Sequence, residues 1–181
     1  MSVDPSLSPC IIELKTRARL GLNALNAGDT TLLDRAAQVC GARMATPPAW
    51  KLRHAFTLVA RSVGFRSWEQ ARTVLSGQAH AGDDMGTFWH APRCSSLLNH
   101  WFARHDEALA CLQTMPGHAL LPYRRQFVVV GEPYLRELGF TEASAHADKT
   151  GCLDMAAHYG DSIWQSLCTT RLRAPESTWI R

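Results

Sequence analysis

Histidine and cysteine are the residues of this sequence whose chemistry could support a metal site. The chain holds eight histidines and six cysteines, and two pairs are close in sequence: His90 with Cys94, and His100 with His105. Zinc sites usually draw on closely spaced ligands such as C-x-x-C or H-E-x-x-H, and neither pattern occurs here. We therefore name these four residues as metal candidates by proximity alone, and we predict neither a bound metal nor a cofactor.

Cysteine is also the nucleophile that the sequence offers to an enzyme mechanism. Such a residue must lie beside a base that is itself held in place. Cys94 or Cys111 could meet His100, His105 or His118 in space, but no G-x-S-x-G, P-loop or G-x-G-x-x-G motif supports such a site. We predict no catalytic residue, and a metal- or cysteine-dependent enzyme stays an alternative.

Arginine and aromatic side chains point to binding instead. Tyr123, Arg124 and Arg125 stand at the entrance of an expected strand, where the guanidinium pair could hold a phosphate or carboxylate and the ring could stack on a base. Six tryptophans are many for 181 residues, and Trp and Arg are common anchors of interfaces. We predict Trp89 and Trp101 as contact residues. The leading hypothesis is a non-catalytic binding or accessory protein that docks on a protein partner.

The clearest local pattern lies between Lys51 and Leu75 and predicts two helices with a turn. Apolar residues recur at helical spacing along the first helix, Gly64 suits its end, and S-x-x-Q at 67–70 forms a capping box. A helix–turn–helix can read DNA. However, Trp68 stands at the start of the second helix, where base contacts would begin, so the spacing favours two helices that pack on each other.

The polar side of that first helix offers a second surface. Lys51, His54 and Arg61 form a basic face. Residues 1–82 carry ten Lys or Arg against five Asp or Glu, whereas residues 83–181 carry nine against eleven. A nucleic-acid-binding protein that uses the basic N-terminal helices is therefore the first alternative function. The formal net charge of +3 is nevertheless far below that of a dense basic stripe.

Composition limits the classes of protein to which this chain can belong. The chain is 46% hydrophobic and 19% charged, which are the values of an ordinary folded protein. No apolar run approaches the roughly 20 residues that span a bilayer, and the first residues do not form a secretory signal. We therefore expect a cytoplasmic protein with reduced thiols and no membrane partner.

Stepwise changes in composition predict two modules. We expect residues 1–76 to form a helical module and residues 86–181 to form an α+β module. Residues 77–85, which are small and polar, are the expected linker between them. The expected helices of the first module span 8–26, 29–40, a third opened by Thr46-Pro47-Pro48, and 68–75. The expected fold class is α+β, with an N-terminal four-helix module followed by a small mixed or antiparallel sheet with flanking helices.

The second module is less regular in sequence. Residues 125–130, with three consecutive valines, are the strongest strand signal, and residues 86–90 suit a short strand. Residues 95–115 fit either one helix, or a strand over 97–103 followed by a helix that Asp106 caps; we favour the second because a Val-rich strand needs partners. The last expected helices span 142–149, 153–159 and 162–172.

Short motifs in both halves resemble motifs of known bacterial families. In the first half they are Leu25–Asp29, His54-Ala55, Val59–Arg61, Gly64-Phe65 and Ser67-Trp68. Through them, residues 11–75 resemble a helical N-terminal module of bacterial proteins of the glyoxalase superfamily and of ankyrin-repeat proteins. Residues 85–139 resemble an uncharacterised bacterial family through Gly86–Trp89, Leu98-Asn99, Trp101-Phe102 and Leu121–Phe127. The first resemblance implies a helical fold, and neither implies a functional residue.

Overall fold

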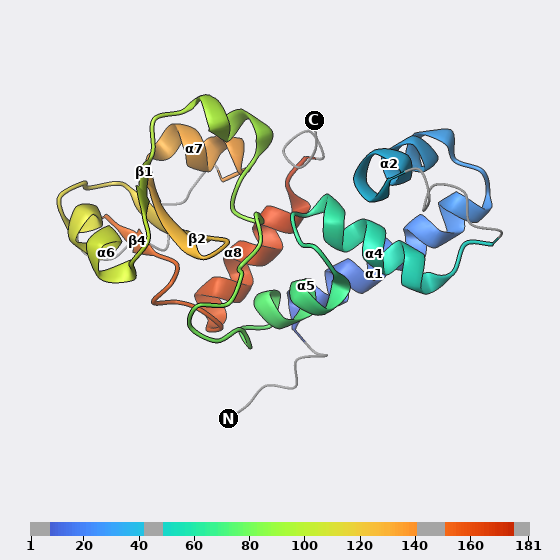
Figure 1. Ribbon diagram of the computed structural model, residues 1–181, viewed down its shortest axis with the longest axis horizontal. Coiled ribbons are helices and arrows are strands. Elements are labelled where there is room, and N and C mark those ends of the chain that lie inside the picture. Colours follow the sequence, from blue (N-terminus) through green and yellow to red (C-terminus); the bar gives the residue numbers. More distant parts are fainter. Residues whose placement is uncertain (1–7, 42–48, 141–150, 176–181) are drawn as a thin grey trace.

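The computed structural model describes residues 8–41, 49–140 and 151–175. Helices and a four-stranded mixed sheet make it an α+β protein, which confirms the predicted class. Figure 1 shows the N-terminal helices on one side, the sheet with its flanking helices on the other, and a long C-terminal helix between them. The C-terminal helix therefore contacts both parts of the chain.

The N-terminal part is built from α1 (Pro9–Asn26), α2 (Thr30–Cys40), α4 (Leu52–Ser62) and α5 (Trp68–Leu75). Two of the predicted caps are present: the Asp29 carboxylate accepts from the Leu32 amide at 3.0 Å, and the Ser67 hydroxyl accepts from the Gln70 amide at 3.2 Å. The predicted self-packing of the helix pair is also seen, because the rings of Phe56 and Trp68 stack at 4.3 Å. The predicted helix start at Thr46–Pro48 lies outside the described residues.

The sheet has the strand order β1-β3-β2-β4, with β1 (His100–Phe102), β2 (Ala119–Tyr123), β3 (Gln126–Val130) and β4 (Leu153–Asp154). β3 pairs antiparallel with β1 and β2, and β4 pairs parallel with β2. The strand-then-helix interpretation of residues 95–115 is confirmed, since β1 is followed by α6 (His105–Gln113). Asp106 lies inside the first turn of α6 and does not occupy the N-cap position, where Arg104 stands.

Two expectations for this half are wrong, each because a distant partner decided the local structure. Residues 86–90 form turns: Gly86 has a φ of +70°, and the Thr87 amide donates to the Gly64 carbonyl at 2.8 Å. Residues 153–159 form β4 and turns because the backbone of Leu153 and Met155 bonds to β2. Pro122 lies inside β2 but beyond Ala119 and Leu120, the residues that pair with β4. Because no described strand pairs with β2 on that side at Pro122, the missing N–H removes no hydrogen bond from the sheet. The expected helix over 142–149 lies outside the described residues.

Helix α8 (Ser162–Arg173) follows the prediction and begins at the Asp161 cap. Its Arg171 is fully buried and donates to the carbonyls of Phe88 at 3.3 Å and Leu138 at 3.0 Å. Phe88 lies shortly before the short helix η2 (Pro92–Ser96), and Leu138 directly follows α7 (Glu132–Glu137). Burial lowers the pKa of Arg171 to about 9, so the side chain is still charged at neutral pH.

One core runs through both halves of the chain. The largest group of touching buried residues draws on α1, α4, α5, β2, β3, α7 and α8 together. Ser8, at the N-cap position of α1, donates to the Gln165 side chain in α8 at 2.6 Å and does not cap its own helix. In the expected linker, the Ala79 amide donates to the Tyr159 hydroxyl at 2.8 Å. The division into modules at 77–85 stays a prediction, and this segment is anchored on the second half.

We predict that Gly77→Ala lowers the free energy of unfolding by more than about 2 kcal/mol. A Cβ at Gly77 would lie 2.3 Å from the Gly160 Cα, and φ is +75°, so two distant backbone segments would have to separate. Gly28→Ala is the matched control: its φ is +81° with nothing within 4 Å, and strain alone costs about 1 kcal/mol. Urea denaturation measures both, and equal losses would contradict the close approach.

Candidate functional site

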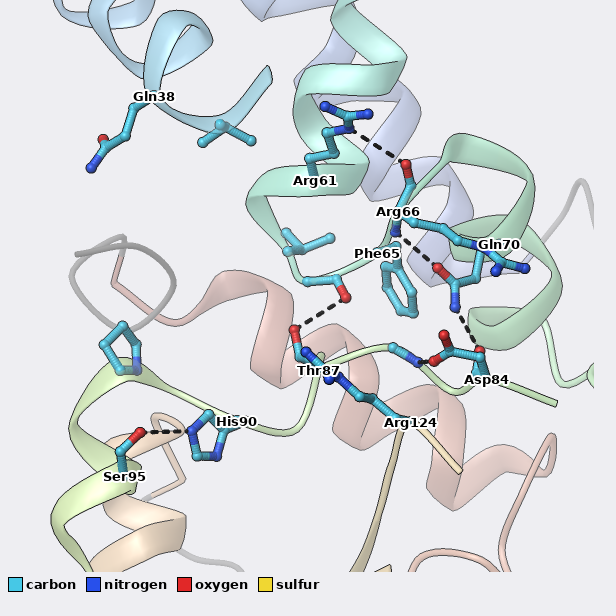
Figure 2. A pocket seen from close by; sticks show the side chains of 15 residues that line it. Gln38, Arg61, Phe65, Arg66, Gln70, Asp84, Thr87, His90, Ser95 and Arg124 are labelled. Atoms are coloured by element: carbon cyan, nitrogen blue, oxygen red, sulfur yellow. Dashed lines mark hydrogen bonds between the residues drawn. The ribbon is translucent and has the colours of Figure 1, made fainter. Parts of the chain in front are cut away.

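An open groove of about 950 Å³ lies where the helical part meets the sheet part (Figure 2). Its described lining combines arginines, amides and hydroxyls with a few apolar side chains. The residues are Gln38, Val39, Arg61, Val63, Gly64, Phe65, Arg66, Gln70, Asp84, Gly86, Thr87, His90, Pro92, Ser95 and Arg124. Because α2, α4, α5, η2 and the β2–β3 hairpin all contribute, neither half of the chain forms this groove alone.

One wall of the groove carries Arg61 and Arg66. Arg61 lies in the last turn of α4, and its Nε donates to the Arg66 carbonyl at 3.4 Å. The Arg66 amide in turn donates to the Gln70 side chain at 2.8 Å, which holds the turn between α4 and α5 (Figure 2). Both guanidinium groups belong to exposed residues, so the wall presents positive charge to the solvent.

The facing wall carries Arg124 at the tip of the β2–β3 hairpin. Tyr123 pairs with Gln126, so Arg124 and Arg125 form a two-residue loop. Arg124 has a φ of +51°, a conformation that an L side chain rarely adopts. Its amide donates to the Gly86 carbonyl at 2.7 Å and its carbonyl accepts from the Met85 amide at 2.8 Å. These two bonds hold the strained residue over the groove.

The groove has a positive balance of charge. Arg61, Arg66 and Arg124 form no ion pair with any other described residue. Asp84 is the one acidic residue in the described lining, and its carboxylate already accepts from the Gly86 amide at 2.8 Å. Guanidinium groups that face an open groove can form charge-assisted hydrogen bonds to carboxylate or phosphate oxygens.

A chain of polar contacts closes one end of the groove. The His90 ring contacts the Ser95 hydroxyl through Nε2 at 3.1 Å and the Tyr134 hydroxyl through Nδ1 at 2.9 Å. Tyr134 is buried and donates to the Trp89 carbonyl at 2.9 Å. Burial lowers the pKa of His90, and the nearby charge of Arg171 lowers it further.

An aromatic hollow of about 510 Å³ lies on the other side of His90. The rings of Tyr123 and Trp101 lie 5.0 Å apart, and the His90 ring is 5.4 Å from Tyr123. Trp101 is 42% exposed and Leu98 is 90% exposed, so apolar surface faces solvent beside the hollow. The Arg124 guanidinium lies 5.5 Å above the Tyr123 ring and links the hollow to the groove.

The structure thus gathers Arg61, Tyr123, Arg124 and Trp101 from the predicted binding residues. It places the others elsewhere. Arg125, the second residue of the hairpin loop, lines a separate hollow beside His105.

The remaining predicted binding residues lie away from the groove. Trp89 is 1% exposed, so it belongs to the core and offers no contact surface. The prediction is wrong because the rings of Phe88, Phe140 and Trp164 pack around it. Lys51 and His54 lie toward the opposite end of α4 from Arg61, about 15 Å and about 10 Å away along the helix axis.

The metal candidates are also separated. His90 contacts Ser95 and Tyr134, whereas His105 pairs with Asp154 at 2.9 Å beside β4. Within the described ranges, no three His, Cys, Asp or Glu residues lie together as a metal site would require. Cys94 is fully buried and burial raises the pKa of its thiol, which makes it a poor nucleophile.

Two residues of this region were missed by the sequence patterns. Ser95 belongs to a short 3-10 helix, and Tyr134 to the six-residue helix α7, and neither carries a motif. Tyr134 is 44 positions from His90, so only the fold brings the two together.

Comparison with known proteins finds no matching family model, no matching curated protein and no matching solved structure. The resemblances of residues 11–75 and 85–139 therefore stay predictions. In the part of the chain that the structure describes, no helix is long and apolar enough to cross a membrane.

We predict that acidification from pH 7 to pH 5 destabilises the protein partly through His90. The folded state lowers the pKa of His90, so the unfolded chain binds the proton more readily and the stability contribution is lost as the pH falls. His90→Gln, which removes the titrating ring, should reduce the dependence of the unfolding free energy on pH. Exposed His80→Gln is the control, and an identical slope in His90→Gln and the wild type would refute the assignment.

Proposed function

We propose that this protein is a binding protein that takes an acidic segment of a partner protein into the groove. The observation that carries this proposal is that Arg61 and Arg66 from the helical part line the same groove as Arg124 from the hairpin. These side chains have no ion-pair partner among the described residues, and such positive groups attract an anionic ligand and orient its carboxylates. The ligand would bridge both halves of the chain.

The surface beside the groove supports a protein partner. Exposed Leu98 and Trp101 line the aromatic hollow together with Tyr123, and the Arg124 guanidinium lies over the Tyr123 ring. An interface commonly combines one or two apolar anchors with charged pairs at its rim. An acidic segment that also carries an apolar residue would satisfy both features, with its carboxylates in the groove and its apolar side chain against Trp101.

Nucleic acid fits the same geometry less well. A duplex or a single strand needs positive charge along several successive phosphates. The basic face predicted on α4 does not continue the groove, because Lys51 and His54 stand at the far end of that helix from Arg61. Asp83 and Asp84 also add negative charge close to the hairpin. The test must therefore distinguish oligonucleotide binding from binding of an acidic peptide.

We predict that a short fluorescent peptide rich in glutamate and ending in leucine binds the protein. The double variant Arg61→Gln/Arg124→Gln should weaken this binding by about tenfold or more, which corresponds to a loss of ~1.4 kcal/mol of binding free energy. Fluorescence anisotropy measures the affinity. Higher salt should weaken binding because it screens exposed charges.

The matched control is Arg19→Gln, which removes the same charge from an exposed position on α1 outside the groove. A peptide with glutamine in place of glutamate should bind neither protein. The proposal fails if Arg19→Gln weakens binding as much as the double variant does. It also fails if a single-stranded oligonucleotide of equal charge binds far more tightly than the acidic peptide.

A further inference from the structure

The hydrogen-bond chain at the end of the groove assigns a tautomer to His90. The Tyr134 hydroxyl donates its one hydrogen to the Trp89 carbonyl, so towards the ring it can only accept. We therefore place the ring proton on Nδ1, which leaves Nε2 as an acceptor that faces the Ser95 hydroxyl at 3.1 Å. A serine whose hydroxyl donates to a histidine that a third group orients is the arrangement of an activated nucleophile.

We propose that Ser95 is a nucleophile, that His90 is its general base, that Tyr134 positions His90, and that the three act on a carboxylic ester whose acyl part enters the aromatic hollow. This inference goes beyond the proposed binding function and does not depend on the arginines. Ser95 lines both the groove and the hollow, and the hollow is walled by Leu97, Trp101 and Tyr123.

The reaction balances with water as the second reactant. The Ser95 oxygen attacks the ester carbonyl carbon while His90 Nε2 takes the hydroxyl proton. The carbon–oxygen bond to the alcohol then breaks, and His90 returns its proton to the leaving alkoxide, which leaves an acyl group on Ser95. Water attacks this acyl group with His90 as base, and the acid departs as Ser95 regains its proton.

The surroundings of the pair favour chemistry over a purely structural bond. Ser95 is exposed, so its hydrogen bond to His90 adds little to stability in competition with water. The buried part of the hydrogen-bond chain, from the Tyr134 hydroxyl to the Trp89 carbonyl, fixes the His90 ring whether or not Ser95 is present. Burial and Arg171 lower the pKa of His90, which keeps the base neutral at pH 7.

The test uses the full-length protein with two probes: hydrolysis of p-nitrophenyl butyrate, a neutral ester, and covalent labelling by a fluorophosphonate mapped by mass spectrometry. We expect labelling at Ser95, and we expect Ser95→Ala to remove it and to lower hydrolysis at least tenfold. His90→Gln should slow labelling about 100-fold. Tyr134→Phe should slow labelling and move its pH profile, because Nδ1 loses its acceptor.

Ser96→Ala is the matched control, because the neighbouring Ser96 hydroxyl donates to the Arg93 carbonyl at 2.9 Å and not to a base. Circular dichroism verifies that each variant is folded. Equal labelling rates for Ser95→Ala and Ser96→Ala, labelling at another residue alone, or a folded protein that neither reacts nor hydrolyses the ester would each overturn the proposal. The result of the peptide-binding test on the arginine variants does not change how these labelling and hydrolysis results are interpreted, so the two proposals can fail separately.

Discussion

The buried guanidinium of Arg171 is the constraint on which the rest of this structure depends. A charge without solvent is costly, and here hydrogen bonds to the carbonyls of Phe88 and Leu138 offset that cost. These bonds fix α8 against the segment before η2 and against the end of α7. The same segment carries His90, so the buried cation both places the histidine and disfavours its protonation.

The candidate site lies beside the segment that Arg171 holds, where the helical part meets the sheet part. Arg61 belongs to the helical part and Arg124 to a hairpin whose strained backbone is held by the neighbouring segment 85–86. His90 stands between the arginine groove and the aromatic hollow, and it lines both. The proposed anion binding and the proposed ester chemistry would therefore use adjacent surfaces, with charge on one side of His90 and apolar surface on the other.

The sequence by itself determined those elements whose signals are local. Helix α5 begins at the Ser67 cap and α8 at the Asp161 cap, because a side chain that accepts from its own first turn needs no distant partner. The three valines of β3 likewise specify a buried strand. Among the site residues, Arg61 and Arg124 could be named in advance because their charge and chain position are visible in the sequence.

Only the tertiary structure decided where distant segments meet. β4 exists because Leu153 pairs with β2, and its short sequence carries no strand signal of its own. Trp89 became core because Phe140 and Trp164, far from it in sequence, pack against its ring. The meeting of Ser95, His90 and Tyr134 depends on the packing of η2 against α7, which no local pattern encodes. Local capping and periodicity set the elements, and burial of shared apolar surface between them set the site.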